Sequence, residues 1–293
     1  MKKILMAAIA LACFTGGSAV TLRAQEQNPP PKVLLIMREM VKVGKGTAHE
    51  KNEAAFARAF AAAKAPDRYL AVTTMSGPSE AWFLEGFGSF ADWEKTNKAD
   101  DEPKISAAVM PYMEKDADYI SDGNQTVATF NEKWSYRPAM SMADMRYFEV
   151  ETIRLRPGHD KDWEDLVTLF KTTADKINMD EHDLFYEGRY GAPAGTIYIF
   201  TPRKSLADLD AALGAGKAFQ DALGPEGQKK WAQLVEETIA NDNTTLVEFS
   251  PQMSLPPDAW VKSDPDYWKP KPMAPPKAPA AAPKPAPAPT TKN

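Results

Sequence analysis

RYFEVETIRLRPGHDKDWEDLVTLF, residues 146–170, changes its hydrophobic period in the middle. Residues 146–155 are rich in aromatic and β-branched side chains, which is typical of a strand. Arg156-Pro157-Gly158 then supplies turn residues. From Trp163 onward the apolar positions follow a three-four spacing, the pattern of an amphipathic helix. The stretch therefore predicts a strand, a tight turn and a helix that packs against the sheet.

The same pattern occurs 112 residues earlier. Residues 33–43 predict a strand and Gly44-Lys45-Gly46 a turn, with an alanine-rich helix after it. At this offset Glu39 aligns with Glu151 and Gly46 with Gly158. Each copy continues with two short strands joined by a Gly/Pro turn, over residues 69–87 and 183–201. These matches predict an internal repeat.

Each copy ends in further helix and a last strand, residues 126–130 in one and 245–249 in the other. The order β-α-β-β-α-β predicts two tandem ferredoxin-like units, residues 33–137 and 145–250, in the α+β class. One unit covers only one face of its sheet with helices. Two units bury the bare faces against each other, so we expect a pseudo-dimeric α/β barrel or a sandwich.

The strand followed by Pro157-Gly158 and a helix with an early aromatic resembles the opening of dimeric α/β-barrel proteins. These include NIPSNAP-type and antibiotic-biosynthesis monooxygenase-type proteins. The resemblance covers both units and implies one barrel made by a single chain. It transfers no reaction, because the superfamily includes oxygenases, haem enzymes, isomerases and plain binders.

The two ends predict no fold. Residues 1–24 resemble an export signal, with Lys2, Lys3 and an apolar stretch too short to span a bilayer. Cleavage after Ala19 or Ala24 gives a periplasmic or extracellular protein without a transmembrane segment. Lipidation at Cys13, the only cysteine, is the less favoured alternative. Residues 270–293, rich in Pro, Ala and Lys, predict a disordered tail that either contacts the cell envelope or has no function. Linkers are expected at 25–32 and 138–144, and an extension at 251–269.

Composition limits the partners. The chain has 293 residues, with 35 Lys and Arg against 40 Asp and Glu, a net charge of −5. An acidic chain without a basic stretch makes nucleic acid an unsuitable partner. A monomer or a weak dimer is expected.

The first candidate site is the aligned pair Glu39 and Glu151. Both lie on strands with apolar neighbours, where a carboxylate either pairs with a base or has a raised pKa. One hypothesis has both lining one cavity as acid and base. The alternative is a salt bridge to Arg38, Arg154 or Arg189.

Arg38, Trp82, Tyr147 and Tyr198 are the candidate lining of a pocket for an apolar or aromatic small molecule. No metal site and no cofactor are predicted. His159 is a weak candidate haem ligand, although His49, His159 and His182 are each expected to be exposed near helix ends or loops. The run Asp180-Glu181-His182-Asp183 is interpreted as a solvated loop.

Whether the chain is an enzyme stays open at this point. The favoured expectation is an exported, non-catalytic small-molecule-binding or envelope-associated barrel protein. The alternatives are a cofactor-independent oxygenase or isomerase, and a haem binder.

Overall fold

The computed structural model describes residues 29–269; the predicted export signal and the tail at 270–293 lie outside them. The described strands are β1 (Val33–Val41), β2 (Tyr69–Thr74), β3 (Glu80–Phe87), β4 (Ile120–Phe130), β5 (Tyr147–Leu155), β6 (Leu184–Tyr190), β7 (Thr196–Arg203) and β8 (Ile239–Phe249). The described helices are α1 (Gly46–Ala62), α2 (Phe90–Asp100), α3 (Pro103–Asp116), α4 (Asp160–Lys176), α5 (Ala207–Thr238), α6 (Asp258–Ser263) and α7 (Pro265–Trp268), with a 3-10 turn at Met142–Asp144.

The strands form one closed antiparallel barrel in the order β1-β3-β2-β8-β5-β7-β6-β4. β1 lies between β3 and β4, and β5 lies between β7 and β8, so the first and last four strands pair in the same way. The pairs β2–β8 and β4–β6 join the two sets and close the barrel. The protein is therefore an α+β barrel, as the sequence predicted.

Successive side chains along each strand point alternately into the barrel and outward toward the helices, which gives two buried faces. One apolar cluster takes residues from all eight strands, including Ile36, Trp82 and Val247, and so fills the barrel interior. Positions of the other parity, such as Phe83 and Ile199, face outward and pack under helices. Burial on both faces explains why residues 34–37 contain no polar residue.

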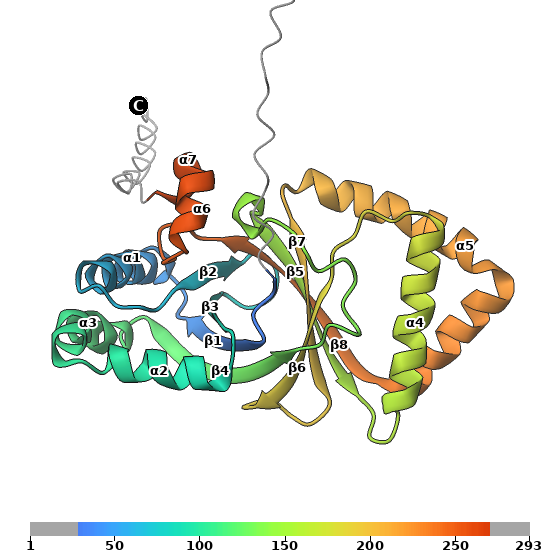
Figure 1. The fold of residues 1–293 in the computed structure, drawn as a ribbon, viewed down its shortest axis with the longest axis horizontal. Helices are drawn as coiled ribbons and strands as arrows, with labels where there is room; N and C mark the ends of the chain where they lie inside the picture. The colour runs from blue at the N-terminus through green and yellow to red at the C-terminus, as the bar shows by residue number, and fades with distance from the viewer. Residues whose placement is uncertain (1–28, 270–293) are drawn as a thin grey trace, which may run out of the picture.

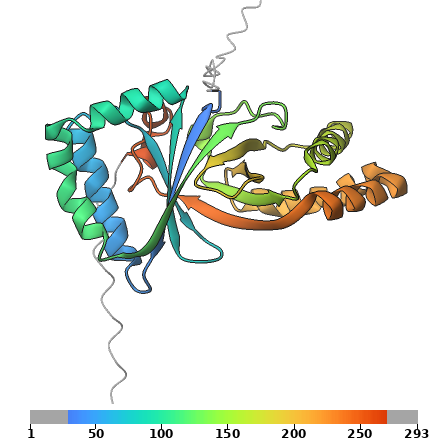
Figure 2. The same ribbon diagram turned by 90° about the horizontal axis from the view of Figure 1, so that it is seen from below.

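Helices α1 to α5 lie outside the barrel on two opposite sides (Figures 1 and 2). α1 packs on α3 beside β1–β4, and α4 packs on α5 beside β5–β8. Each half of the barrel therefore has its own space between sheet and helices. No helix within residues 29–269 is long and apolar enough to cross a bilayer.

One difference from the sequence prediction concerns the lengths of two strands. β4 and β8 each begin six residues before the predicted strand, at Ile120 and Ile239. Their first halves are polar and largely exposed, so they lack the alternation that marks a strand. The range given as α5 is interrupted at Gly224, whose φ of 65° and ψ of 174° are not helical, and Pro225 begins its second helical piece, as the sequence predicted.

The expected extension at residues 251–269 packs on one end of the barrel. Trp268 is 1% exposed and its indole Nε1 donates to the Ala143 carbonyl at 2.8 Å. Tyr267 Oη donates to the Phe249 carbonyl at 3.0 Å, and Arg146 pairs with Asp264. These contacts make the extension part of the fold.

Candidate active site

A cavity of about 460 Å³ lies between the outer face of β5–β8 and the helices α4 and α5. This volume is in the range of small-molecule sites. Its floor is formed by outward positions of β5 and β7, among them Glu151, Ile153 and Ile199.

One part of the cavity wall is aromatic. Trp163 and Phe170 come from α4, Phe185 from β6 and Trp231 from α5. The Trp163 ring lies 6.1 Å from the Phe185 ring, centroid to centroid. The three-four spacing that predicted α4 places Trp163 and Phe170 on the sheet-facing side of that helix. The wall suits a flat apolar molecule.

The other part of the wall is acidic. Burial, followed by the charge of Asp242, raises the pKa of Glu151. Burial raises the pKa of Asp183 to about 7, and the Thr201 hydroxyl donates to this carboxyl at 2.7 Å. The charge of Glu151 contributes to the raised pKa of Asp183, so the two groups interact. Among the described residues Glu151 makes no hydrogen bond or ion pair, which leaves its carboxylate available to a ligand.

Arg203 is the cation of this site. Its guanidinium donates to Glu149 and forms an ion pair with Glu181, at 2.7 Å each. The side chains of Arg203 and Glu181 are 10% and 8% exposed, so this ion pair is shielded from water. The two carboxylates fix the guanidinium beside the Asp183 carboxyl, where it favours a developing negative charge.

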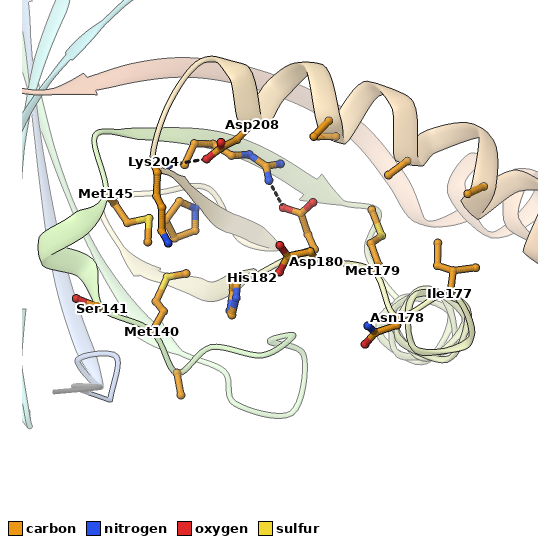
Figure 3. Close-up of a pocket in the computed structure, with 18 residues that line it drawn as sticks. Met140, Ser141, Met145, Ile177, Asn178, Met179, Asp180, His182, Lys204 and Asp208 are labelled. Carbon is orange, nitrogen blue, oxygen red and sulfur yellow. Dashed lines mark hydrogen bonds and ion pairs between the residues drawn. The ribbon is translucent and has the colours of Figure 1, made fainter. Parts of the chain in front are cut away.

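A second cavity, of about 590 Å³, adjoins the first (Figure 3). Glu181, Arg203 and Met179 line both cavities. Met140, Met145 and His182 line one side of the second cavity, and the alanines of α5 line the other. The Arg203–Glu181 pair thus stands between two spaces on the same side of the barrel.

The structure corrects the hypothesis of a shared Glu39–Glu151 cavity. Glu39 contacts His49 under α1, whereas Glu151 lines the cavity under α4 and α5. Both are outward positions, and outward positions of β1 and β5 face different helices on opposite sides of the barrel. The expected arginine partners are also wrong, because Glu39 pairs with His49 and Arg38 pairs with Glu80.

The four residues named as a pocket do not come together. Arg38 and Trp82 lie inside the barrel, where both donate to Glu80 and the guanidinium lies 4.3 Å from the Trp82 ring centre. Tyr198 is also interior, and Tyr147 lies on the outer face of β5. None of these four residues lines any of the three cavities within residues 29–269.

The third cavity is about 470 Å³ and opens at one end of the barrel. Its lining is almost wholly apolar and includes Leu34, Phe148, Tyr186 and Trp260. The sole side-chain charges on it are Lys32 and Arg68. It can hold an apolar molecule, but it presents no carboxyl group for proton transfer.

The histidines need one correction. His49 is 2% exposed, not a surface residue, because α3 covers the first turn of α1. His159 is partly exposed, with its Nδ1 2.9 Å from Asp162, and it faces none of the three cavities. His159 therefore offers no axial position for a haem bound in them.

Sequence reasoning missed Glu181, Asp183 and Arg203. The run 180–183 was expected to be a solvated loop, but Glu181 is 7% exposed and Asp183 is 6% exposed. A charge run looks solvated when its partner is unknown, and Arg203 lies 20 residues away along the chain. Asp183 and Thr201 lie at the two ends of the predicted hairpin, so their pairing was the one sequence feature that could have indicated a buried Asp183.

Comparison with known proteins finds similarity to solved structures and to no family model or curated protein. A candidate monooxygenase of Fusobacterium nucleatum subsp. nucleatum is 12% identical, with a TM-score of 0.48 over 75% of this chain and 93% of that chain. A chlorite dismutase mutant of Candidatus Nitrospira defluvii is 10% identical, with a TM-score of 0.42 over 79% of this chain and 95% of that chain. An anthrone oxidase-like protein is 10% identical, with a TM-score of 0.48 over 74% and 91%. At these identities no reaction is transferred to this chain.

Proposed function

We propose that the chain is an acid–base enzyme that moves a proton on a small aromatic molecule bound between Glu151 and the aromatic wall. The single observation that carries this proposal is the sharing of one cavity by the half-buried Glu151, the buried Asp183 and four aromatic rings. The substrate class is an aromatic ketone or its enol, because the cavity offers a base, an acid and flat apolar walls.

The chemistry divides between the two carboxyls. In its carboxylate form Glu151, which has no partner among the described residues, removes the proton from the carbon next to the carbonyl. The electron pair moves onto the carbonyl oxygen, and Asp183 supplies the proton that this oxygen takes up. With a pKa of about 7, Asp183 is partly protonated at neutral pH and can serve as this acid. Glu151 then returns its proton to a different carbon of the conjugated enol, while the enol oxygen gives its proton back to Asp183. The carbonyl re-forms and both carboxyls are restored, which completes an isomerisation.

The same first step opens a cofactor-independent oxygenase reaction, in which dioxygen then reacts with the carbanion. Proton removal is common to both reactions, so it is the step to test. The aromatic wall contributes by keeping water from the carbanion.

Exchange of the α-protons of 2-tetralone into D2O, followed by proton NMR, measures this step directly. We expect the wild-type chain to accelerate exchange above buffer, and Glu151→Gln to lower that acceleration by about 10²-fold or more. Asp183→Asn should lower it as well, with the pH profile losing its limb near pH 7.

The matched control is Glu164→Gln, which alters an α4 carboxylate whose side chain is 44% exposed. This variant should exchange protons at the wild-type rate. Exchange no faster than in buffer, or exchange unchanged in Glu151→Gln, would falsify the proposal.

We also propose that the barrel arose by tandem duplication of a ferredoxin-like unit. Equivalent elements begin 114 residues apart, at Val33 and Tyr147 for β1 and β5 and at Gly46 and Asp160 for α1 and α4. Glu39 therefore aligns with Ile153 and not, as the sequence offset of 112 predicted, with Glu151. Each central strand also has a bulge toward its end, at Met40/Val41 and at Arg154/Leu155. A residue-by-residue superposition of the two halves tests this origin.

A non-catalytic binding role is the second candidate, and the apolar cavity at the barrel end favours it. That cavity lacks carboxyl groups but would hold an apolar ligand against Phe148 and Trp260. In that case 2-tetralone would bind without any proton exchange, and Leu34→Trp would abolish binding.

Export and envelope association through residues 270–293 belong to the same proposal. Edman sequencing of the secreted chain would locate the cleavage after Ala19 or Ala24. Loss of envelope fractionation on deletion of 270–293 would support a tether, and unchanged fractionation would contradict it. Light scattering tests the expected monomer or weak dimer.

A further inference from the structure

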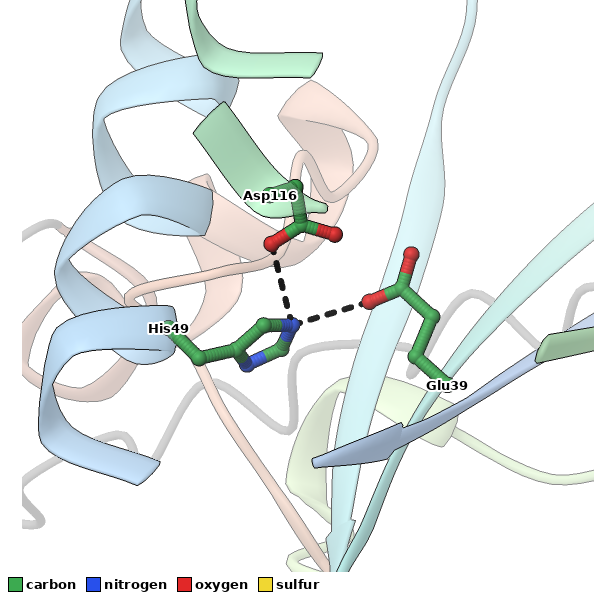
Figure 4. A group of neighbouring side chains, drawn as sticks. All are labelled: Glu39, His49 and Asp116. Atoms are coloured by element: carbon green, nitrogen blue, oxygen red, sulfur yellow. Dashed lines mark hydrogen bonds and ion pairs between the residues drawn. The ribbon is translucent and has the colours of Figure 1, made fainter. Parts of the chain in front are cut away.

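A second cluster of titratable groups lies in the other half of the molecule, under α1 and α3 (Figure 4). His49 Nε2 lies 2.9 Å from Glu39 Oε2 and 3.6 Å from Asp116 Oδ1. The residues come from β1, the first turn of α1 and the last turn of α3, so three separate elements converge on one point.

The spacing of these atoms matches the edges of a metal coordination sphere. The three ligand atoms lie within 4.8 Å of one another. Metal–ligand bonds of about 2.0–2.2 Å place neighbouring ligand atoms about 3.0–3.5 Å apart. The two distances to His49 Nε2 cover this range.

Asp116 supplies an independent sign of a missing ligand. The residue is 8% exposed, and its Oδ1, the atom that points toward His49, has no hydrogen-bond partner. An unpartnered carboxylate oxygen in a buried site carries a substantial desolvation cost. A bound cation would remove it.

The composition of the cluster also favours a bound cation. Glu53, one helical turn after His49, is 8% exposed and adds a third carboxyl. Within residues 29–269 no lysine or arginine forms an ion pair with these three carboxyls. Three carboxyl groups therefore gather around one imidazole without a Lys or Arg partner.

We propose that Glu39, His49 and Asp116 bind one divalent transition-metal ion, with Glu53 beside it as a further carboxyl. One imidazole nitrogen with carboxylate oxygens suits Zn²⁺ or Mn²⁺, whereas Mg²⁺ and Ca²⁺ prefer oxygen alone. The Glu39 side chain is 23% exposed, so the ion has a route from solvent.

The site belongs to this half alone and is independent of the proposed proton-transfer site. α1 and α4 begin 114 residues apart, so the residue equivalent to His49 is Trp163. An indole side chain does not ligate a metal ion. The proposed metal site and the proposed function of the Glu151 cavity can therefore be tested independently of each other.

Calorimetric titration of the untagged, EDTA-dialysed full chain with ZnCl2 tests the proposal. We expect one Zn²⁺ per chain, with affinity reduced about tenfold or more in His49→Gln and in Asp116→Asn. The matched control is His159→Gln, which removes the histidine of an exposed histidine–carboxylate pair and should leave binding unchanged.

A second measurement covers the case in which a variant fails to fold, as judged by circular dichroism. Co²⁺ added to the wild-type chain should give the visible absorption bands of a nitrogen- and oxygen-ligated ion, and one equivalent of Zn²⁺ should abolish them. The absence of stoichiometric Zn²⁺ binding and of Co²⁺ bands would overturn the proposal. Binding that survives in folded His49→Gln, or that is lost in His159→Gln, would overturn it too.

Discussion

Arg203 and Glu181 form a shielded ion pair at 2.7 Å, with side chains 10% and 8% exposed, between two cavities on one side of the barrel. The last residue of β7 thereby fixes the segment that precedes β6. This pair holds the acidic wall of the candidate active site, including Asp183, at the edge of the sheet.

Loss of Arg203 should destabilise the chain strongly. Arg203→Met leaves Glu149 and Glu181 without their cation, and breaking a buried pair costs about 3–5 kcal/mol. Urea unfolding followed by circular dichroism measures the free energy of unfolding. Lys161→Ala, which breaks an exposed pair with Asp165, should cost no more than about 1 kcal/mol. Equal effects of the two variants would contradict this account of the acidic wall.

Stability should fall with rising pH because of Glu85. Burial, followed by the charges of Asp67 and Asp100, raises the pKa of Glu85 from 4.5 to about 8 in the folded chain. Between these values the folded chain holds a proton that the unfolded chain has released. Its contribution is therefore complete below pH 4.5 and is lost as the pH rises through 8, at up to about 1.4 kcal/mol per pH unit.

Glu85→Gln should flatten this dependence. Urea unfolding at several pH values from 5 to 9 should show a shallower decline in Glu85→Gln than in the wild-type chain. Glu94→Gln, at a carboxylate whose side chain is 67% exposed, serves as the control and should follow the wild-type curve. Parallel curves for wild type and Glu85→Gln would show that Glu85 is ionised in the folded chain.

The extension after β8 should contribute measurably to folding. Trp268→Ala removes a fully buried indole and its hydrogen bond to Ala143, for a loss of about 3–5 kcal/mol. Thermal and urea unfolding both report this loss. Leu213→Ala, at a side chain in a residue that is 81% exposed, should change stability by about 0.5 kcal/mol or less. A similarly small effect of Trp268→Ala would mean that the extension does not pack on the barrel.

Sequence periodicity and the recurring turn residues predicted the strands of the barrel, because strands such as β3 and β7 are buried on both faces. Alternation along a strand predicts which residues share a face, but it does not predict which helices cover that face. For this reason the predicted cavity shared by Glu39 and Glu151 was wrong. Contacts between segments far apart in the sequence could not be predicted from periodicity either. His49 meets Asp116 67 positions later, and Glu181 meets Arg203 across a hairpin. Exposure expected from residue type therefore failed at the groups that carry the candidate chemistry.

Filling the cavity under α4 and α5 should block the ligand. Val235→Phe places a larger side chain at the α5 wall and should weaken 2-tetralone binding about tenfold or more, by tryptophan fluorescence titration. The control is Met142→Phe, at the lining of the barrel-end cavity, which should leave the affinity unchanged. The reverse result would assign the ligand to the barrel end.

The most direct measurement locates the ligand itself. Crystals soaked with 6-bromo-2-tetralone give an anomalous bromine peak that marks the ligand position. We expect this peak between β5 and α4, with the ketone directed toward Glu151 and Asp183. A peak beside Phe148 and Trp260 at the barrel end, or no peak, would contradict the claim that the Glu151 cavity is the active site.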